Sequence, residues 1–108
     1  MAETYKVREP SGSERIRAIV TDVTVSTAGE VFREAAKKPE QRVLVVRFEG
    51  SENGYSVQSD RAMTLIEPPT KKSNLLRWKK TYGEYPEIGQ EIELRFDSEK
   101  RRWEPVLN

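Results

Sequence analysis

The chain has 108 residues, the size of one domain, and we expect a small core because only 35% of them are hydrophobic and 34% are charged. The 19 basic and 18 acidic residues leave a net charge of +1, which excludes a global attraction to nucleic acid or membranes and leaves only local clusters. The lack of cysteine and histidine excludes disulfides, thiolate or imidazole metal ligands, and Ser-His or Cys-His catalysis.

Residues 1–13 are polar and end in "EPSGS", which predicts a flexible leader before a single domain at residues 14–108. Residues 14–27, "ERIRAIVTDVTVST", alternate and are rich in β-branched residues, as strands are. Two sets of apolar residues in this strand have opposite parity: Ile16, Ala18 and Val20 against Ile19, Val23 and Val25. A change of buried face predicts a bulge or bend that lets one strand serve two sides of a barrel.

Residues 28–41, "AGEVFREAAKKPEQ", carry apolar residues at helical spacing before Pro39. This pattern predicts a short helix or an ordered loop, and the alternative is a mobile loop whose Phe32 only covers the edge of the core.

Residues 41–50, "QRVLVVRFEG", are the clearest strand. Alternation places Leu44, Val46 and Phe48 on one face, and the other face carries Val43, Val45 and Arg47. The Asn-Gly pair in "SENG" (residues 51–54) predicts a type I′ hairpin turn. Residues 55–65 then return as a strand with Tyr55 and Val57 in phase.

Residues 70–83, "TKKSNLLRWKKTYG", are basic and contain no acidic residue. Ser73 is a candidate N-cap and Gly83 a candidate helix end. Helical spacing places Leu75, Leu76, Trp78 and Tyr82 in one apolar stripe, so the aromatic rings belong to the core. The helical cations then form a solvated face that can touch phosphates but does not read bases.

Residues 84–97 contain a Pro-x-x-Gly turn and a strand with Ile92, Leu94 and Phe96 on one face. "SEK" turns the chain, and residues 101–107, "RRWEPVL", form the last strand. The chain therefore alternates strand, connection, strand, hairpin, strand, helix, strand, hairpin and strand.

In this order, and in the run "SNLLRWKKTYGEYPEIGQEIELRF" (residues 73–96), the chain resembles small single-domain OB-fold proteins. The resemblance covers residues 14–107. It implies a mainly β fold, a five-stranded Greek-key barrel with a short helix between the third and fourth strands. A five-stranded SH3-like barrel and an α+β roll are the alternatives.

The resemblance also implies a ligand site, because OB domains bind single-stranded nucleic acid or oligosaccharide across strands 2 and 3. The outward residues expected there include no aromatic ring for base stacking: Val43, Val45, Arg47, Ser56, Gln58 and Asp60. The two valines fit a protein contact equally well.

The last hairpin places Lys100, Arg101 and Arg102 beside Trp103, a combination that suits phosphate and base contacts. Alternatively, Trp103 is buried at the closure of the barrel, and Glu99 and Glu104 neutralise the cations. Lys71 and Lys72 are unfavourable beside a helix N-terminus, which makes them candidates for function.

We therefore expect a non-enzymatic domain that binds single-stranded DNA or RNA weakly through basic side chains. Its acids are dispersed among bases rather than paired for acid–base catalysis, and we expect no cofactor or metal. The alternative is a protein-interaction or assembly module, such as a homodimer, that uses the strand 2–3 face or a barrel edge. No membrane span is present in the sequence, so we expect a cytoplasmic protein, and the many Glu, Lys and Arg residues are typical of a thermophile. The candidate nucleic-acid-binding residues are Arg47, Lys71, Lys72, Arg77, Lys80, Lys100, Arg101 and Arg102.

Overall fold

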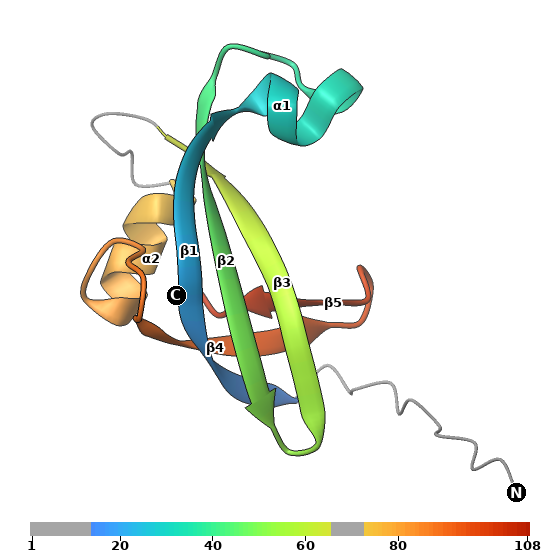
Figure 1. Cartoon of the computed structure of the whole chain (residues 1–108), viewed down its shortest axis with the longest axis vertical. Helices are drawn as coiled ribbons and strands as arrows, with labels where there is room; N and C mark the ends of the chain where they lie inside the picture. The colour runs from blue at the N-terminus through green and yellow to red at the C-terminus, as the bar shows by residue number, and fades with distance from the viewer. Residues whose placement is uncertain (1–13, 66–72) are drawn as a thin grey trace, which may run out of the picture.

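The computed structural model describes residues 14–65 and 73–108 (Figure 1). Their five strands form one antiparallel sheet in the order β3-β2-β1-β4-β5, which curls into a nearly closed barrel. The strands are β1 (Arg15–Thr27), β2 (Arg42–Glu52), β3 (Tyr55–Thr64), β4 (Glu91–Asp97) and β5 (Arg102–Pro105). The helices are α1 (Ala28–Phe32), the 3-10 turn η1 (Arg33–Ala35) and α2 (Asn74–Tyr82).

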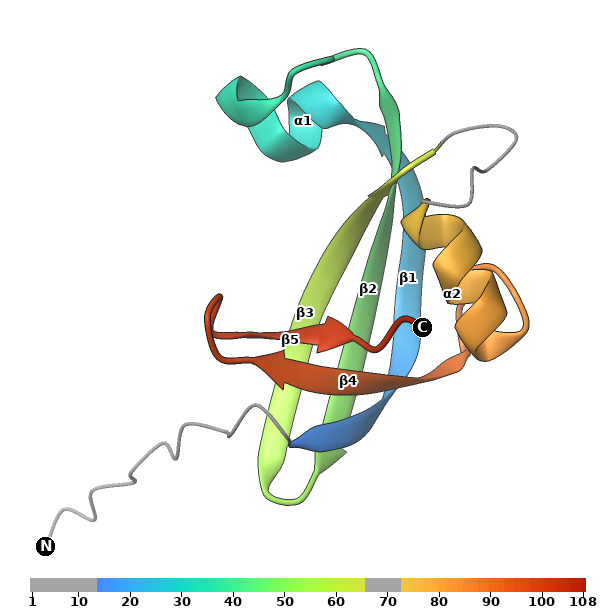
Figure 2. The same cartoon turned by 180° about the vertical axis from the view of Figure 1, so that it is seen from behind.

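The predicted fold class is confirmed: the described chain is mainly β, and α2 is a short helix between the third and fourth strands. This arrangement is compatible with an OB-like fold. Seen from behind, β4 and β5 run across the other three strands, and the edge strands β3 and β5 approach each other there (Figure 2). Arg102 Nη2 donates a hydrogen bond to the carbonyl oxygen of Asp60 at 3.0 Å, which links these two edges.

Strand β1 serves both sides of the barrel, as its pattern predicts. It pairs with β4 through Arg15–Ile19 and with β2 from Ile19 to Thr27, and the register shifts between Val20 and Asp22. Ile16, Ala18 and Val20 are all buried. The second apolar set is only partly buried: Val23 packs against the core, whereas Ile19 and Val25 are about half exposed.

The connection after β1 forms α1 and η1, so the helical alternative is confirmed. Thr27 caps α1, because its hydroxyl oxygen accepts a hydrogen bond from the Glu30 amide at 3.4 Å. The amide of Ala28 donates to the carbonyl of Gln41 at 2.7 Å, so the connection returns beside the start of β2.

The prediction that Val43 lies on an open outer face is wrong. Val43 is 1% exposed, and Val45 is partly buried. Val43 lies one residue into β2, at the end of the sheet where α1 begins and where Ala28 is also buried. The strand alternation is present, but both faces are covered at this end. A Val43/Val45 contact surface is therefore not available.

Helix α2 packs on the core as its apolar stripe predicts. Leu75 and Trp78 are buried, and the Trp78 indole N–H donates to Gln90 Oε1 at 2.9 Å. Gly83 ends the helix in the left-handed conformation (φ 83°), and its amide donates to the Lys79 carbonyl at 2.7 Å. Ser73 occupies the N-cap position with extended backbone, but its hydroxyl makes no capping hydrogen bond among the described residues.

The core of the barrel combines residues from all five strands and α2. Phe48 and Val46 come from β2, Val57 and Met63 from β3, and the predicted face of β4 is buried. The Asn-Gly turn between β2 and β3 has positive φ at both residues (53° and 82°), as a type I′ turn requires. The core and the hairpin turn thus hold β3, β5 and α2 together where the barrel closes.

Candidate functional site

A pocket of about 160 Å³ lies where α2, β3, β4, β5 and the segment after β5 meet. We call it the basic pocket, because its charged lining contains three arginines and two carboxylates. Its lining residues are Arg61, Arg77, Arg95, Asp97, Glu104, Pro105, Val106 and Leu107.

Glu104 binds the cations on one side of the basic pocket. Its Oε1 atom lies 3.5 Å from Arg61 Nη1, 3.5 Å from Lys100 Nζ and 3.7 Å from Arg102 Nε. The Glu104 and Arg61 side chains are only 19% and 23% exposed, so solvent screens this contact less than a surface pair. Because three cations share one carboxylate, the group keeps excess positive charge.

Arg77 is tied to the segment after β5. Its Nε donates to the carbonyl oxygen of Asn108 at 3.1 Å, and its Nη2 donates to that of Leu107 at 3.2 Å. The Asn108 amide in turn donates to the Thr81 hydroxyl oxygen at 2.8 Å. Arg77 is exposed, as the solvated face of α2 predicts, and its guanidinium group in addition holds the segment that lines the pocket.

The second carboxylate, Asp97, stabilises the β4–β5 turn. Its Oδ1 accepts hydrogen bonds from the amides of Lys100 (3.2 Å) and Glu99 (3.0 Å). The Lys100 amide, the Glu99 amide and the nearby charges of Lys100 and Arg95 lower the pKa of Asp97. Asp97 is thus ionised and engaged by its own turn, which positions Lys100 and Arg102 beside the pocket.

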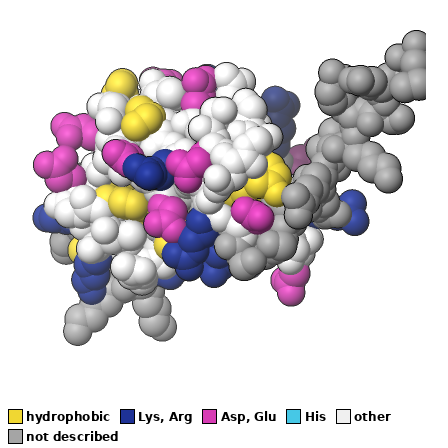
Figure 3. Space-filling model, turned by 90° about the horizontal axis from the view of Figure 1, so that it is seen from below, with side chains coloured by type: hydrophobic (Ala, Val, Ile, Leu, Met, Phe, Trp, Pro, Cys, Tyr) yellow, Lys and Arg dark blue, Asp and Glu magenta, His cyan; other side chains and the backbone are white. Residues whose placement is uncertain are grey.

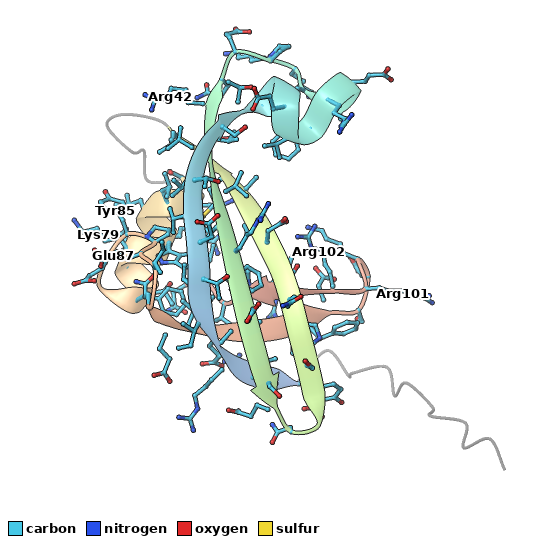
Figure 4. All side chains as sticks on the ribbon, viewed as in Figure 1. Arg42, Lys79, Tyr85, Glu87, Arg101 and Arg102 are labelled. Carbon is cyan, nitrogen blue, oxygen red and sulfur yellow. The ribbon has the colours of Figure 1, made fainter. Side chains whose placement is uncertain are left out.

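The structure brings some of the predicted binding residues together. Arg77 lines the basic pocket, and Lys100 and Arg102 contact Glu104 at its rim. Arg101 is exposed on the β4–β5 turn, where Figure 4 shows it beside Arg102, and its φ is 53°. Lys80 is exposed on α2 and does not line the pocket. Lys71 and Lys72 lie outside the described residues.

Arg47 lies apart from this group, on the outer face of β2. The strand register places Asp22 and Asp60 directly opposite it, and these three residues line a second hollow together with Glu49. Acids outnumber bases there, so the face that the OB resemblance implies for ligands is unfavourable for phosphates. Viewed from the end with the β2–β3 hairpin, the surface mixes acidic and basic side chains (Figure 3).

Trp103 is not available for base contacts. It is 9% exposed and packs against Phe96 and Tyr55, with ring centroids 5.4 Å apart in both pairs. The alternative in which Trp103 is buried at the barrel closure is the one observed, and of its two acids Glu104 contacts Lys100 and Arg102.

Sequence reasoning missed Arg61 and Arg95, which lie singly in strands and away from the basic runs. A signal for Arg61 was present: it has the same parity in β3 as the buried Val57 and Met63. An arginine at an inward position predicts an opening in the barrel or a buried ion pair, and Arg61 here has both a pocket and Glu104.

Tyr82 holds α2 against the strands that line the basic pocket. Its hydroxyl lies 2.7 Å from the Val106 carbonyl oxygen and 3.1 Å from the Glu93 carbonyl oxygen, and accepts from the Glu93 amide at 3.3 Å. Burial is the main cause that raises the pKa of Tyr82.

We expect Tyr82→Phe to lower the free energy of unfolding by about 1–2 kcal/mol, because these partly buried groups lose their partner. Because the pKa of Tyr82 is raised in the folded state, its hydroxyl contributes fully to the free energy of unfolding below about pH 10. This contribution is lost as the pH rises through the folded-state pKa. Urea denaturation at neutral and alkaline pH measures both effects. The gap between the two proteins should shrink at high pH, and Tyr85→Phe, on an exposed ring, should change stability by less than about 0.5 kcal/mol. An equal loss in both variants would contradict this role.

Comparison with protein-family models, with curated protein sequences and with solved structures found no match for the chain. No helix within the described ranges is long and apolar enough to cross a membrane. Across residues 14–65 and 73–108, no cluster of three or more acidic side chains is arranged to hold a metal ion.

Proposed function

We propose that this chain is a non-enzymatic domain that binds single-stranded DNA or RNA through the basic pocket and the β4–β5 turn. The observation that carries the proposal is the gathering of five cations around two engaged carboxylates in a chain whose net charge is only +1. The five cations are Arg61, Arg77, Arg95, Lys100 and Arg102.

The OB-like arrangement supports the proposal. We propose, however, that the nucleic acid follows the closure between β3 and β5, and not the outer face of β2 and β3 that the resemblance implies. The outer face of β2 and β3 is acidic around Arg47, whereas the closure between β3 and β5 is basic. The Trp103 ring, which follows the turn in the chain, and the Tyr55 ring pack against each other in the barrel wall. Phosphate contacts therefore supply most of the affinity, and binding should be weak and strongly salt-dependent.

The test is a fluorescence titration of a labelled single strand of about 12 nucleotides at low and moderate salt. The observed affinity should fall as salt rises, with a logarithmic slope of about −0.7 per phosphate contact. Replacing Arg95, Lys100 and Arg102 together with glutamine should reduce the slope by about two units and weaken binding at least tenfold.

The matched control removes the same charge from the other end of the molecule, by replacing Arg33, Lys37 and Lys38 with glutamine. These residues belong to the connection that contains α1, far from the β4–β5 turn in both ribbon views (Figures 1 and 2). The control should leave the slope unchanged. Lack of binding at low salt, binding indifferent to salt, or equal losses in both triple variants would refute the proposal.

A second candidate function, contact with another protein, is favoured by an exposed apolar pair in the loop between α2 and β4. Ile88 is 66% and Tyr85 41% exposed, and the Lys79 ammonium lies 4.9 Å from the centre of the Tyr85 ring. Figure 4 shows Tyr85 and Lys79 on the opposite side of the molecule from Arg101 and Arg102. Light scattering separates the candidates: self-association abolished by Ile88→Ser supports protein contact, and a strict monomer counts against a homodimer.

A further inference from the structure

The basic pocket is small for a nucleotide and large enough for an anion. Its volume is about 160 Å³, whereas pockets that enclose drug-sized ligands measure about 300–1,000 Å³. A space of this size suits a small anionic group better than a base with its sugar. A phosphate within a strand carries a sugar on both sides, but a phosphate at the end of a strand carries only one. The pocket is thus better suited to a terminal phosphate than to an internal one.

The charge of the pocket favours the same group. A phosphomonoester carries about −1.5 to −2 charges at neutral pH and three acceptor oxygens, whereas an internal phosphodiester carries a single charge. Three arginines from three elements line the pocket: Arg61 from β3, Arg77 from α2 and Arg95 from β4. Guanidinium groups bind phosphate oxygens through paired hydrogen bonds, so three arginines around one pocket suit a dianion.

Two of the three arginines are held in place by contacts within the protein. Arg77 is held by the carbonyls of Leu107 and Asn108 through two nitrogens, and Arg61 is held by Glu104. A guanidinium group has five N–H donors, so these contacts leave donors for a ligand. Preorganisation of this kind lowers the entropy lost on binding.

The two carboxylates do not block an anion. Asp97 accepts two amide hydrogen bonds from its own turn, and Glu104 is shared by three cations. Glu104 thus acts as an internal counter-ion that keeps Arg61, Lys100 and Arg102 together and still leaves their combined charge in excess.

From these observations we propose that the basic pocket binds the terminal phosphomonoester of a single-stranded nucleic acid, so that the domain recognises a phosphorylated strand end. This inference rests on the proposed function and specifies which part of the strand the pocket takes. The strand itself would leave the pocket along the β4–β5 turn, where Lys100 and Arg102 contact its internal phosphates.

The experiment compares one labelled strand in three forms: with a 5′-phosphate, with a 3′-phosphate and with hydroxyl groups at both ends. We expect one phosphorylated form to bind about tenfold more tightly than the hydroxyl form, as charge-assisted arginine contacts to a dianion allow. Inorganic phosphate should compete with the phosphorylated strand and reduce its advantage.

Two variants assign the preference to the pocket. Arg61→Gln combined with Arg95→Gln should remove the preference and retain binding of the hydroxyl strand through the β4–β5 turn. Arg17→Gln, an exposed arginine on β1 that pairs with Glu52 and Glu91, should keep the preference. If the double variant does not fold by circular dichroism, Arg95→Gln alone, at an exposed position, should still reduce the preference.

Equal affinity for the three strands would overturn this inference and leave the proposed function intact. A preference that survives the double substitution would also overturn it, because the pocket would not be its source. Failure of all three strands to bind would overturn both proposals.

Discussion

Replacing Trp78 with alanine should lower the free energy of unfolding by about 3–5 kcal/mol, the range for deleting a large aromatic side chain from a core. Trp78 is 0% exposed and is among the largest fully buried side chains of the described residues. Its ring packs against Tyr82 with centroids 5.1 Å apart, and its N–H binds Gln90 Oε1. The substitution leaves a cavity between α2 and the barrel and removes the partner of a glutamine oxygen.

Guanidinium denaturation followed by the fluorescence of Trp103 measures this effect, because Trp103 is the tryptophan that remains. The total stability of small domains is about 5–15 kcal/mol, so the alanine variant can be unfolded at the outset. In that case Trp78→Phe, which keeps part of the side-chain volume, replaces it in the measurement. Tyr85→Ala is the matched aromatic control, at an exposed ring, and should lose no more than about 1 kcal/mol. Similar losses of unfolding free energy at Trp78 and Tyr85 would contradict the packing of α2 in the core.

Gly50→Ala should destabilise the chain by about 1–3 kcal/mol, the range for forcing an extra carbon into a packed region. A Cβ atom at Gly50 would lie 2.6 Å from the carbonyl oxygen of Arg17 and 3.0 Å from the Cβ of Ala18. The closest atom belongs to the backbone of β1, which cannot rotate away as a side chain does. In an open strand the same substitution would instead gain roughly 0.5–1 kcal/mol from reduced backbone entropy, so the sign of the effect tests the contact.

The control for Gly50→Ala is Ser51→Ala, the next residue of β2, which is exposed and should change stability by less than about 0.5 kcal/mol. Thermal unfolding of the two variants gives the comparison. A neutral or stabilising effect of Gly50→Ala would mean that β1 and β2 do not approach as closely as the structure has them.

The close approach at Gly50 and the packing of Trp78 bear on the proposed site, because they hold β1, β2 and α2 together in the barrel. Strand β1 bends past β2 and pairs with β4, and α2 joins β3 to β4. Together these contacts place β5 against β3, and the basic pocket lies at that junction. Loss of either contact should therefore weaken the proposed phosphate binding along with stability.

Much of the fold was predictable from residues close together in the chain. Parity within β1 indicated its bend, Asn53-Gly54 indicated the hairpin, and Leu75 and Trp78 indicated the buried face of α2. Each of these features depends on side-chain spacing or turn chemistry over a few residues, which local sequence carries directly. The burial of Val43 was not predictable in this way, because it depends on what covers the other face of its strand.

Local sequence patterns determined the five strands, helix α2 and the separation of its aromatic and basic faces, whereas the segment of α1 stayed open between a helix and a loop. Only the tertiary structure decided which charges act together. The tertiary structure joins Arg61 of β3 to Glu104 of β5 and binds Arg77 of α2 to the segment after β5. It leaves Arg47 of β2 among acidic residues. The physical reason is the barrel closure, which brings Asp60 and Arg102, 42 residues apart in the chain, into hydrogen-bond contact. Periodicity within one strand carries no information about that distance.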